Sequence, residues 1–305
     1  MTEFALGLAA LGRPTYVNVG RDGVHRSVDE LRALAHATLD AAWDAGVRAF
    51  DAARSYGRAE EFLGAWFAAH PTRRRECTVS SKWGYRYTAG WDPDAEVHEV
   101  KEHTLDHFRT QWAETRATLG VPDLYQVHSL TTDSPLFDDG PLLEALGGLR
   151  DGGVRLGFST SGPDQADAVG RGLALRVGGE PLFTAVQSTW NLLETSVGDA
   201  LASAHDDGVR VLVKEGVANG RLVVDPPAPL ARVAAAHGVG ADAVALAAIA
   251  AQPFVDVVLS GAADPGQLAA NLAPVTLSDD ELAELTSLAQ PVGEYWTYRR
   301  AMAWV

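Results

Sequence analysis

Residues 47–57 of this 305-residue chain, VRAFDAARSYG, decide its fold. The stretch begins with a short apolar run, residues 47–50, which is typical of a buried β-strand. The run stops at a charged residue, Asp51, and Tyr56 follows in the next segment. Because a carboxylate is costly to bury without a partner, an aspartate where a buried strand ends indicates that a positively charged group lies close to it.

Two further apolar runs end at ionisable residues in the same way. The run TVSSK ends at Lys82, and the run LYQVH ends at His128. If the three strands lie side by side, an acid, a phenol, an ammonium and an imidazole meet at their ends. The sequence therefore predicts one site in which Asp51 and Tyr56 lie beside the lysine and the histidine.

The rest of the chain alternates between strand and helix patterns, without a linker or a low-complexity segment. A long helix is predicted within residues 94–119, after an irregular start. This alternation over a chain of this length predicts an α/β fold, a single (β/α)₈ TIM barrel that spans residues 1–305 and carries its active site at the C-terminal ends of the strands. The rival is a doubly wound open sheet, whose glycine-rich fingerprint the segment GLAALG does not match. Eight strands are predicted, at residues 4–11, 47–51, 78–82, 124–128, 154–159, 185–191, 209–214 and 255–260.

The composition excludes several classes of partner. The formal net charge is −15, which argues against binding nucleic acid or an anionic membrane surface. The single cysteine, Cys77, cannot form an internal disulfide, so a reducing compartment is expected. No stretch approaches membrane-spanning length, and the N-terminal segment lacks the basic start of a signal peptide, so we expect a cytoplasmic protein.

The four residues suit the delivery of a proton. A free phenol has a pKa of about 10, and a nearby ammonium lowers it by stabilising the phenolate. Lys82 is placed to do this for Tyr56, provided that Asp51 holds the lysine and offsets its charge. His128 can donate a hydrogen bond to a substrate oxygen. The set therefore fits protonation of a carbonyl oxygen as it becomes an alkoxide, and we expect no metal ion, because no cluster of metal ligands accompanies it.

Each residue taken singly also has an ordinary structural interpretation. An Asp–Lys pair is most often a structural salt bridge, a lone histidine at a strand end is often a hydrogen-bonded core residue, and a loop tyrosine is common. The convergence of all four on one barrel end is what favours the functional interpretation.

These motifs resemble those of the aldo-keto reductases. The resemblance implies an oxidoreductase that reduces an aldehyde or ketone, or oxidises the corresponding alcohol or sugar, with NADPH as cofactor and NADH as a possible substitute. It implies that Tyr56 is the proton donor, that Lys82 and Asp51 adjust the acidity of its phenol, and that His128 orients the substrate. The matching segments occur in the order and spacing of that family and cover nearly the whole chain: FDAARSYG, TVSSKWG, DLYQVHS, LRDGGVRLGFS, VQSTWNLLE and SGAADPGQLAANL.

The resemblance also implies where the cofactor binds. The nicotinamide carboxamide is expected at Ser159, at Thr160 beside it, and at Gln187. Backbone amides at a helix start suit the anionic pyrophosphate. The remaining cofactor contacts are expected from the segments after the seventh and eighth strands, at Lys214, Arg221, Ser260, Gly261, Gln267 and Asn271.

The chain departs from the family pattern at three places. Thr160 replaces the expected amide side chain. Lys214 stands where an aromatic ring often stacks on the nicotinamide, and Glu215 stands near the expected pyrophosphate, where it is repulsive unless Lys214 or Arg221 neutralises it. Residues 261–264 contain no lysine or arginine, although many members hold the 2′-phosphate of NADPH there, so Arg221 or another arginine is needed for that task.

Three tryptophans are candidates for the wall of the substrate pocket, namely Trp83, Trp190 and Trp296, with ordinary packing as the alternative for each. Two other classes of function compete with the reductase. A non-catalytic barrel that senses a nucleotide or binds a partner is motivated by the unusual Lys214-Glu215 pair. Metal-dependent hydrolysis is disfavoured, because the strand ends lack clustered histidine and carboxylate ligands.

Overall fold

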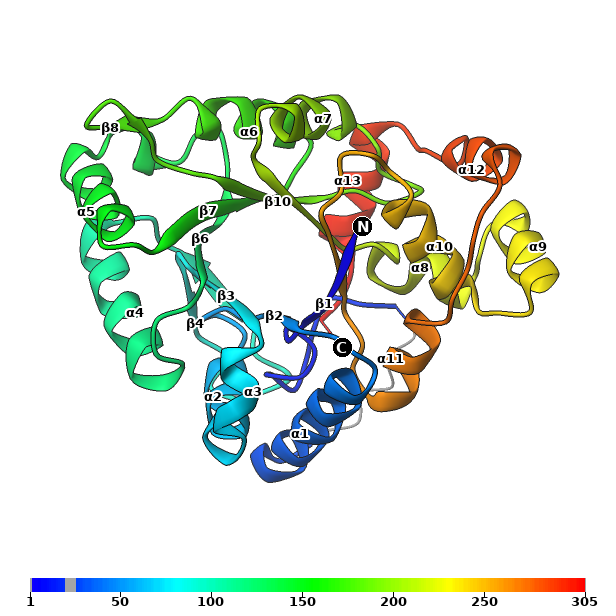
Figure 1. Ribbon diagram of the computed structural model, residues 1–305, viewed down its shortest axis with the longest axis horizontal. Coiled ribbons are helices and arrows are strands. Elements are labelled where there is room, and N and C mark those ends of the chain that lie inside the picture. The colour runs from blue at the N-terminus through cyan, green and yellow to red at the C-terminus, as the bar shows by residue number, and fades with distance from the viewer. Residues whose placement is uncertain (1, 20–25, 305) are drawn as a thin grey trace.

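The computed structural model describes residues 2–19 and 26–304, which form a closed barrel of eight parallel strands surrounded by helices (Figure 1). This confirms the predicted (β/α)₈ architecture. Going round the barrel, the strands are β1 (Glu3–Gly7), β2 (Ala49–Asp51), β3 (Thr78–Trp83), β6 (Leu124–Leu130), β7 (Arg155–Thr160), β10 (Ala185–Thr189), β11 (Arg210–Lys214) and β12 (Val257–Ser260).

Helices cover the outside of this barrel, and two short antiparallel hairpins are added to it. The hairpins pair β4 (Tyr85–Tyr87) with β5 (Glu99–Lys101) and β8 (Arg176–Val177) with β9 (Glu180–Pro181). The α-helices are α1 (Val28–Asp44), α2 (Ala59–Ala69), α3 (Pro71–Arg75), α4 (Leu105–Thr118), α5 (Gly140–Asp151), α6 (Gln165–Leu173), α7 (Gly198–Asp206), α8 (Arg221–Val224), α9 (Ala228–His237), α10 (Ala241–Ala250), α11 (Pro265–Asn271), α12 (Asp279–Thr286) and α13 (Val292–Ala301).

The barrel interior is apolar at one level and polar at the next. Side chains two residues apart on a strand share a face. The apolar level is one buried cluster that includes Ala49, Leu124 and Ala185. Two positions farther along the same strands, Asp51, Gln126 and Gln187 occupy the polar level, where both amides donate hydrogen bonds to the Asp51 carboxylate. The polar site therefore stands on an apolar floor, at the C-terminal ends of the strands. The apolar level consists of three alanines, three leucines and one valine: Ala5, Ala49, Leu124, Ala185, Leu212, Val257 and Leu259.

Two sequence predictions about element bounds were wrong in detail. The long helix starts at Leu105 rather than near residue 94, because Thr104 caps it by accepting a hydrogen bond from the His107 backbone N–H, and the preceding residues form β5 instead. The first strand ends at Gly7 rather than at residue 11. The backbone turns there, because the N–H groups of Leu11 and Gly12 both donate to the carbonyl of Leu8.

Within the part of the chain that the structure describes, no single helix is long and apolar enough to cross a membrane. Helices α9 and α10 meet the length and composition requirement only as a pair, and they are bent by 95° relative to one another.

Candidate active site

The structure brings Asp51, Tyr56, Lys82 and His128 together at the C-terminal ends of three adjacent strands. Asp51 is the last residue of β2, Lys82 lies near the end of β3, and His128 lies near the end of β6. Strand β3 is paired with β2 on one side and with β6 on the other. The four side chains therefore lie close together, as the sequence predicted.

Asp51 and Lys82 form a buried ion pair at the centre of this group. The side chains are 4% and 0% exposed, so the charges are almost fully removed from water, and Lys82 Nζ donates to Asp51 Oδ2. The other carboxylate oxygen, Oδ1, accepts from Ser80 Oγ at 2.5 Å and from the amide of Gln187 at 3.3 Å. A buried ion pair is tolerated when its remaining hydrogen-bonding capacity is satisfied in this way.

Lys82 also reaches the phenol of Tyr56, with 3.4 Å between Nζ and the hydroxyl oxygen. Tyr56 lies in the loop after β2, where Gly12 packs so closely that a Cβ atom there would lie 2.2 Å from the Tyr56 carbonyl oxygen. Gly57 has a φ of +60° and approaches Gly12 in turn. These two glycines therefore fix the loop that places the phenol.

The pKa of Tyr56 is raised well above its usual value, because of burial first and the Asp51 carboxylate second, while Arg13 acts in the opposite direction. This differs from the expectation that a lysine-lowered pKa would dominate. A raised pKa keeps Tyr56 protonated at neutral pH, which is the state that a proton donor needs. An alkoxide formed beside it is basic enough to take that proton.

His128 is turned toward the site by an irregularity in its strand. The pairing of β6 with β7 shifts between Val127 and Leu130, and Ser129 has a φ of +53°, rare for a residue other than glycine. The Ser129 N–H donates to Ser159 Oγ at 2.8 Å, which holds the irregular backbone in place. The His128 ring lies 5.4 Å from the Tyr56 ring, centroid to centroid.

His128 is neutral at physiological pH, because burial lowers its pKa well below the usual value and the positive charge of Lys82 lowers it further. Its Nδ1 lies 3.3 Å from Ser55 Oγ. When Ser55 donates to Nδ1, the ring proton sits on Nε2, and the histidine can donate a hydrogen bond from that nitrogen.

Two cavities open beside this group. The first, which we call the long cavity, has a volume of about 260 Å³. It runs from Asp51, Tyr56 and Gln187 to the start of α11, and α8 and the start of α10 also line it. At its wall, the buried Asn219 Oδ1 has no hydrogen-bond partner among residues 2–19 and 26–304. An elongated cavity with an unpaired buried acceptor fits a dinucleotide, whose amide and hydroxyl groups can donate to such an atom.

Most of the predicted cofactor residues line the long cavity: Gln187, Lys214, Ser260, Gly261, Gln267 and Asn271. The other three do not. Ser159 and Thr160 are completely buried; Ser159 Oγ accepts from the backbone of Ser129, and Thr160 Oγ1 lies 2.7 Å from Ser188 Oγ. Arg221 instead donates to Gln290, which precedes α13, and its guanidinium lies over the ring of Tyr298 in α13. Arg221 therefore lines neither the long cavity nor the second cavity described below.

The second cavity, which we call the mouth cavity, has a volume of about 280 Å³. It shares Tyr16, Tyr56, Lys214 and Glu215 with the long cavity. The C-terminal segment closes one side, where Trp304 stacks on His98 with 4.4 Å between ring centroids. The rest of the lining includes residues of the β1–α1 loop, the β4–β5 hairpin and α13, namely Arg13, Val17, Tyr85, Glu99, Arg299 and Arg300.

Glu215 is neutralised by Arg299, and not by Arg221 as one of the sequence alternatives proposed. Arg299 of α13 makes a forked contact with the Glu215 carboxylate, at 2.8 Å from its Nη2 atom. Burial alone would raise the pKa of Glu215, but the charges of Arg299 and Lys214 outweigh burial and lower it to about 2. Glu215 also has a φ of +57°, so this contact holds a strained backbone position.

We expect Arg299→Met to destabilise the protein by about 3 kcal/mol at pH 7, because the variant leaves Glu215 buried without its main partner. The pKa of Glu215 is depressed in the folded state, so the stability from this pair is present above about pH 4.5 and is lost as the pH falls towards 2. Urea unfolding at several pH values should show the difference from the unaltered protein shrinking below pH 4.5. The adjacent Arg300, exposed and without an ion-pair partner among the described residues, provides the control: Arg300→Met should change stability by less than about 0.5 kcal/mol.

The three candidate tryptophans belong to the hydrophobic core, so the expectation that they line the substrate pocket receives no support from the cavities. Trp83 packs on Phe108, and Trp190 packs on Phe254. Trp296 is 5% exposed and packs against its neighbour Tyr295. Indole rings of this size bury a large apolar area in the core, which accounts for their positions.

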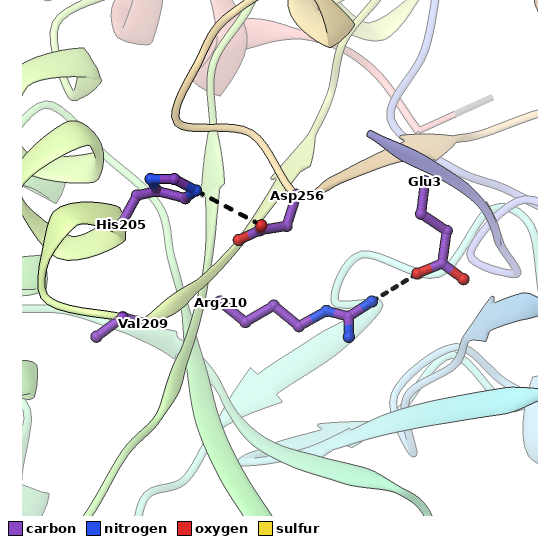
Figure 2. A pocket seen from close by; sticks show the side chains of 6 residues that line it. Glu3, His205, Val209, Arg210 and Asp256 are labelled. Atoms are coloured by element: carbon purple, nitrogen blue, oxygen red, sulfur yellow. Dashed lines mark hydrogen bonds and ion pairs between the residues drawn. The ribbon is translucent and has the colours of Figure 1, made fainter. Parts of the chain in front are cut away.

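A further hollow of about 330 Å³ lies at the opposite end of the barrel, where β1, β11 and β12 begin (Figure 2). Its ionisable side chains contact one another: Arg210 pairs with Glu3 at 2.5 Å, and the His205 ring lies 3.7 Å from the Asp256 carboxylate. Since these side chains have partners and lie at the opposite end of the barrel from the strand ends that carry the site, we assign the hollow no role. No group of three or more potential metal ligands occurs among residues 2–19 and 26–304.

The chain belongs to the aldo/keto reductase family, whose model matches residues 22–290. Two curated relatives are dehydrogenases by name. A pyridoxal 4-dehydrogenase from Microbacterium luteolum is 30% identical over 152 residues, which is 43% of this chain and 40% of the relative. A D-threo-aldose 1-dehydrogenase from a Pseudomonas species is 34% identical over 148 residues, covering 42% and 43% of the two chains. The matches therefore span about two fifths of each relative.

Solved structures share the barrel fold. A glycerol dehydrogenase from Gluconobacter oxydans superposes with a TM-score of 0.69 and 20% identity, over 93% of this chain and 90% of the other. An aldo-keto reductase from Bacillus halodurans, in its holo form, gives a TM-score of 0.68 and 19% identity, over 94% and 92%. At this level of identity the likeness supports the fold.

Proposed function

We propose that this protein is an oxidoreductase that interconverts a carbonyl compound and an alcohol, with a nicotinamide dinucleotide as cofactor and Tyr56 as proton donor. In the reducing direction, an aldehyde or ketone, a reduced nicotinamide and one proton give an alcohol and the oxidised nicotinamide. The observation that carries the proposal is the contact of Lys82 with both Asp51 and Tyr56, at a point where two cavities meet.

Each residue has a distinct task in this proposal. A bound reduced nicotinamide supplies the hydride for the carbonyl carbon. Tyr56 gives its hydroxyl proton to the carbonyl oxygen, and Lys82 stabilises the phenolate that remains. Asp51 holds the Lys82 ammonium and offsets its charge. His128, neutral and close to Tyr56, donates a hydrogen bond that orients the substrate oxygen.

Hydride and substrate are expected to meet where the two cavities join. Tyr56 lines both, so a nicotinamide in the long cavity and a carbonyl group in the mouth cavity would lie on either side of the same phenol. The long cavity then holds the remainder of the dinucleotide, with the adenosine at the far end, beside α8, α10 and α11.

We expect NADH to bind at least as tightly as NADPH. The far end of the long cavity has no lysine or arginine in its described lining, and it contains the carboxylate of Asp242 at the start of α10. A 2′-phosphate placed there would meet a like charge without a cation to hold it. Asp242→Asn should therefore tighten NADPH binding about fivefold and change NADH binding much less. Titration of tryptophan fluorescence with each dinucleotide measures both constants, and a clear preference for NADPH in the unaltered protein would contradict this prediction.

The proposed function is tested by two measurements on the same preparation. The first is the dinucleotide titration, and the second follows the loss of reduced-nicotinamide absorbance with a panel of small aldehydes and ketones. Binding together with turnover supports the reductase. Binding without turnover of any carbonyl or alcohol would instead favour a barrel that senses the nucleotide, the alternative raised by Lys214 and Glu215.

A further inference from the structure

The mouth cavity carries an excess of positive charge. Four cationic side chains line it, Arg13, Lys214, Arg299 and Arg300, against two anionic ones, Glu99 and Glu215. This imbalance is opposite in sign to the net charge of −15 of the whole chain. The overall composition of the chain therefore does not account for the positive charge of the mouth cavity.

Both acids of the mouth cavity are already paired. Glu99 accepts from Arg13 at 2.9 Å, and Glu215 accepts from Arg299 at 2.8 Å. His128 adds no charge, because its pKa is lowered far enough to keep it neutral. Lys214 and Arg300 are thus the two cations of this wall without an ion-pair partner of their own among the described residues.

Lys214 is the more informative of the two, because its side chain is partly buried, whereas Arg300 is exposed. Its Nζ donates to Thr189 Oγ1 at 2.7 Å, a neutral partner that uses one of the three N–H groups of an ammonium. Burying an ammonium without a dedicated anion is costly, and an anion brought in by a ligand would remove that cost. Lys214 lines the long cavity as well as the mouth cavity, but only the mouth cavity also contains His128 and Arg300. An anion that meets both Lys214 and Arg300 therefore belongs to the molecule in the mouth cavity, whose carbonyl group Tyr56 and His128 address.

We propose that the substrate is a small aldehyde or ketone that also carries an anionic group, held by Lys214 and Arg300. The inference rests on the proposed function and adds the chemical class of the substrate. A cavity of about 280 Å³ lies near the lower end of the range for small-molecule sites and suits a small substrate. The carbonyl oxygen lies at Tyr56 and His128, and the anionic group lies toward β11 and α13.

The charge of Lys214 depends on pH in a range that is easily reached. Burial lowers its pKa to about 8; Glu215 and Asp51 oppose the shift, and Arg299 and Lys82 add to it. The neutral His128 faces the same group of side chains. Below pH 8 the ammonium is present, so preference for an anionic substrate should be full at pH 7 and should decline as the pH rises above about 8.

The test compares matched substrates that differ in charge. One pair is 4-oxobutanoate and butanal, and the other is glyceraldehyde 3-phosphate and glyceraldehyde. We expect kcat/KM to be at least tenfold higher for the charged member of one of the pairs, mainly through a lower KM, and to fall toward the neutral value at high salt. The pair that shows the preference distinguishes a carboxylate from a phosphate.

Variants assign the preference to the two residues. Lys214→Met and Arg300→Gln should each lower the charged-to-neutral ratio of kcat/KM about tenfold, and Lys214→Arg, which keeps the charge, should restore most of it. Arg155→Gln is the matched control, because it removes an exposed arginine at the opposite end of β7, and its ratio should equal that of the unaltered protein. Equal kcat/KM values within both pairs, with ready turnover of the neutral aldehydes, would overturn this inference alone; absence of turnover for all four compounds would instead count against the proposed function.

Discussion

Tyr56→Phe is expected to lower kcat for carbonyl reduction by about 10²–10⁴-fold. The substitution removes one hydroxyl group from a side chain that is 9% exposed and leaves the ring that packs in the core and against His128. Without the hydroxyl, the alkoxide that forms at the carbonyl oxygen keeps the hydrogen bond from the neutral His128 but loses the phenol that gives it a proton. Because the fold and the long cavity stay intact, dinucleotide binding should change by less than about threefold.

A matched control for this variant is Tyr125→Phe. Tyr125 is 1% exposed on the same barrel, but its ring packs against Trp112 of α4 and lines neither cavity. It therefore loses the same buried hydroxyl with no loss of a proton donor, and kcat should stay within about twofold. If Tyr56→Phe retained more than a tenth of the original kcat, Tyr56 would not be the proton donor.

The protonation states of Tyr56 and His128 indicate the pH range in which the site suits reduction. The pKa of Tyr56 is raised by burial and by Asp51, so the phenol stays protonated throughout the neutral range. The pKa of His128 is lowered, so it stays neutral there as well. These two states are the ones that reduction needs, which is why the geometry suits carbonyl reduction near neutral pH.

The fold was predictable because the barrel repeats one local pattern. Each buried strand is a short apolar run with a clear end, and the ionisable residues Asp51, Lys82 and His128 stand at three of those ends. Once the strand order is known, parallel pairing brings the three side chains together. Local sequence therefore determined most of the fold and the core of the site.

The walls of the cavities were not predictable in the same way. Arg299 lies 84 residues along the chain from Glu215, and Arg13 lies 86 residues from Glu99. No periodic pattern marks such pairs, since they depend on where α13 and the β4–β5 hairpin pack over the barrel. The two consecutive arginines at positions 299 and 300 were the sequence feature that could have indicated a partner for Glu215. The structure shows that Arg299, and not Arg300, makes this ion pair.

The cofactor residues show a related limit of sequence patterns. Ser159 and Thr160 occupy the expected place at the end of β7, but the irregular backbone of β6 engages Ser159 and a neighbouring strand engages Thr160. Gln187, another residue predicted to bind the cofactor, lines the long cavity and also donates to Asp51 of the ion pair. A polar residue at the position expected for cofactor binding can thus use its side chain for hydrogen bonds within the barrel.

Lys82→Met is expected to have a large effect on both stability and activity. The variant leaves the buried carboxylate of Asp51 without its cation inside the barrel. Removing one partner of a buried ion pair costs about 3–5 kcal/mol, so the urea unfolding midpoint should fall clearly while the unfolding slope stays unchanged. Turnover should also fall by at least about 10²-fold, because the phenolate of Tyr56 loses the positive charge that stabilises it.

The double variant Asp51→Asn with Lys82→Met separates these two effects. It removes both charges together, so most of the lost stability should return, because the cost of the single variant comes largely from an unpaired buried charge. Activity should not return, since the ammonium beside Tyr56 is still missing. A stable double variant with restored turnover would show that the ion pair serves only the fold, whereas a stable but inactive one assigns Lys82 to the proton transfer.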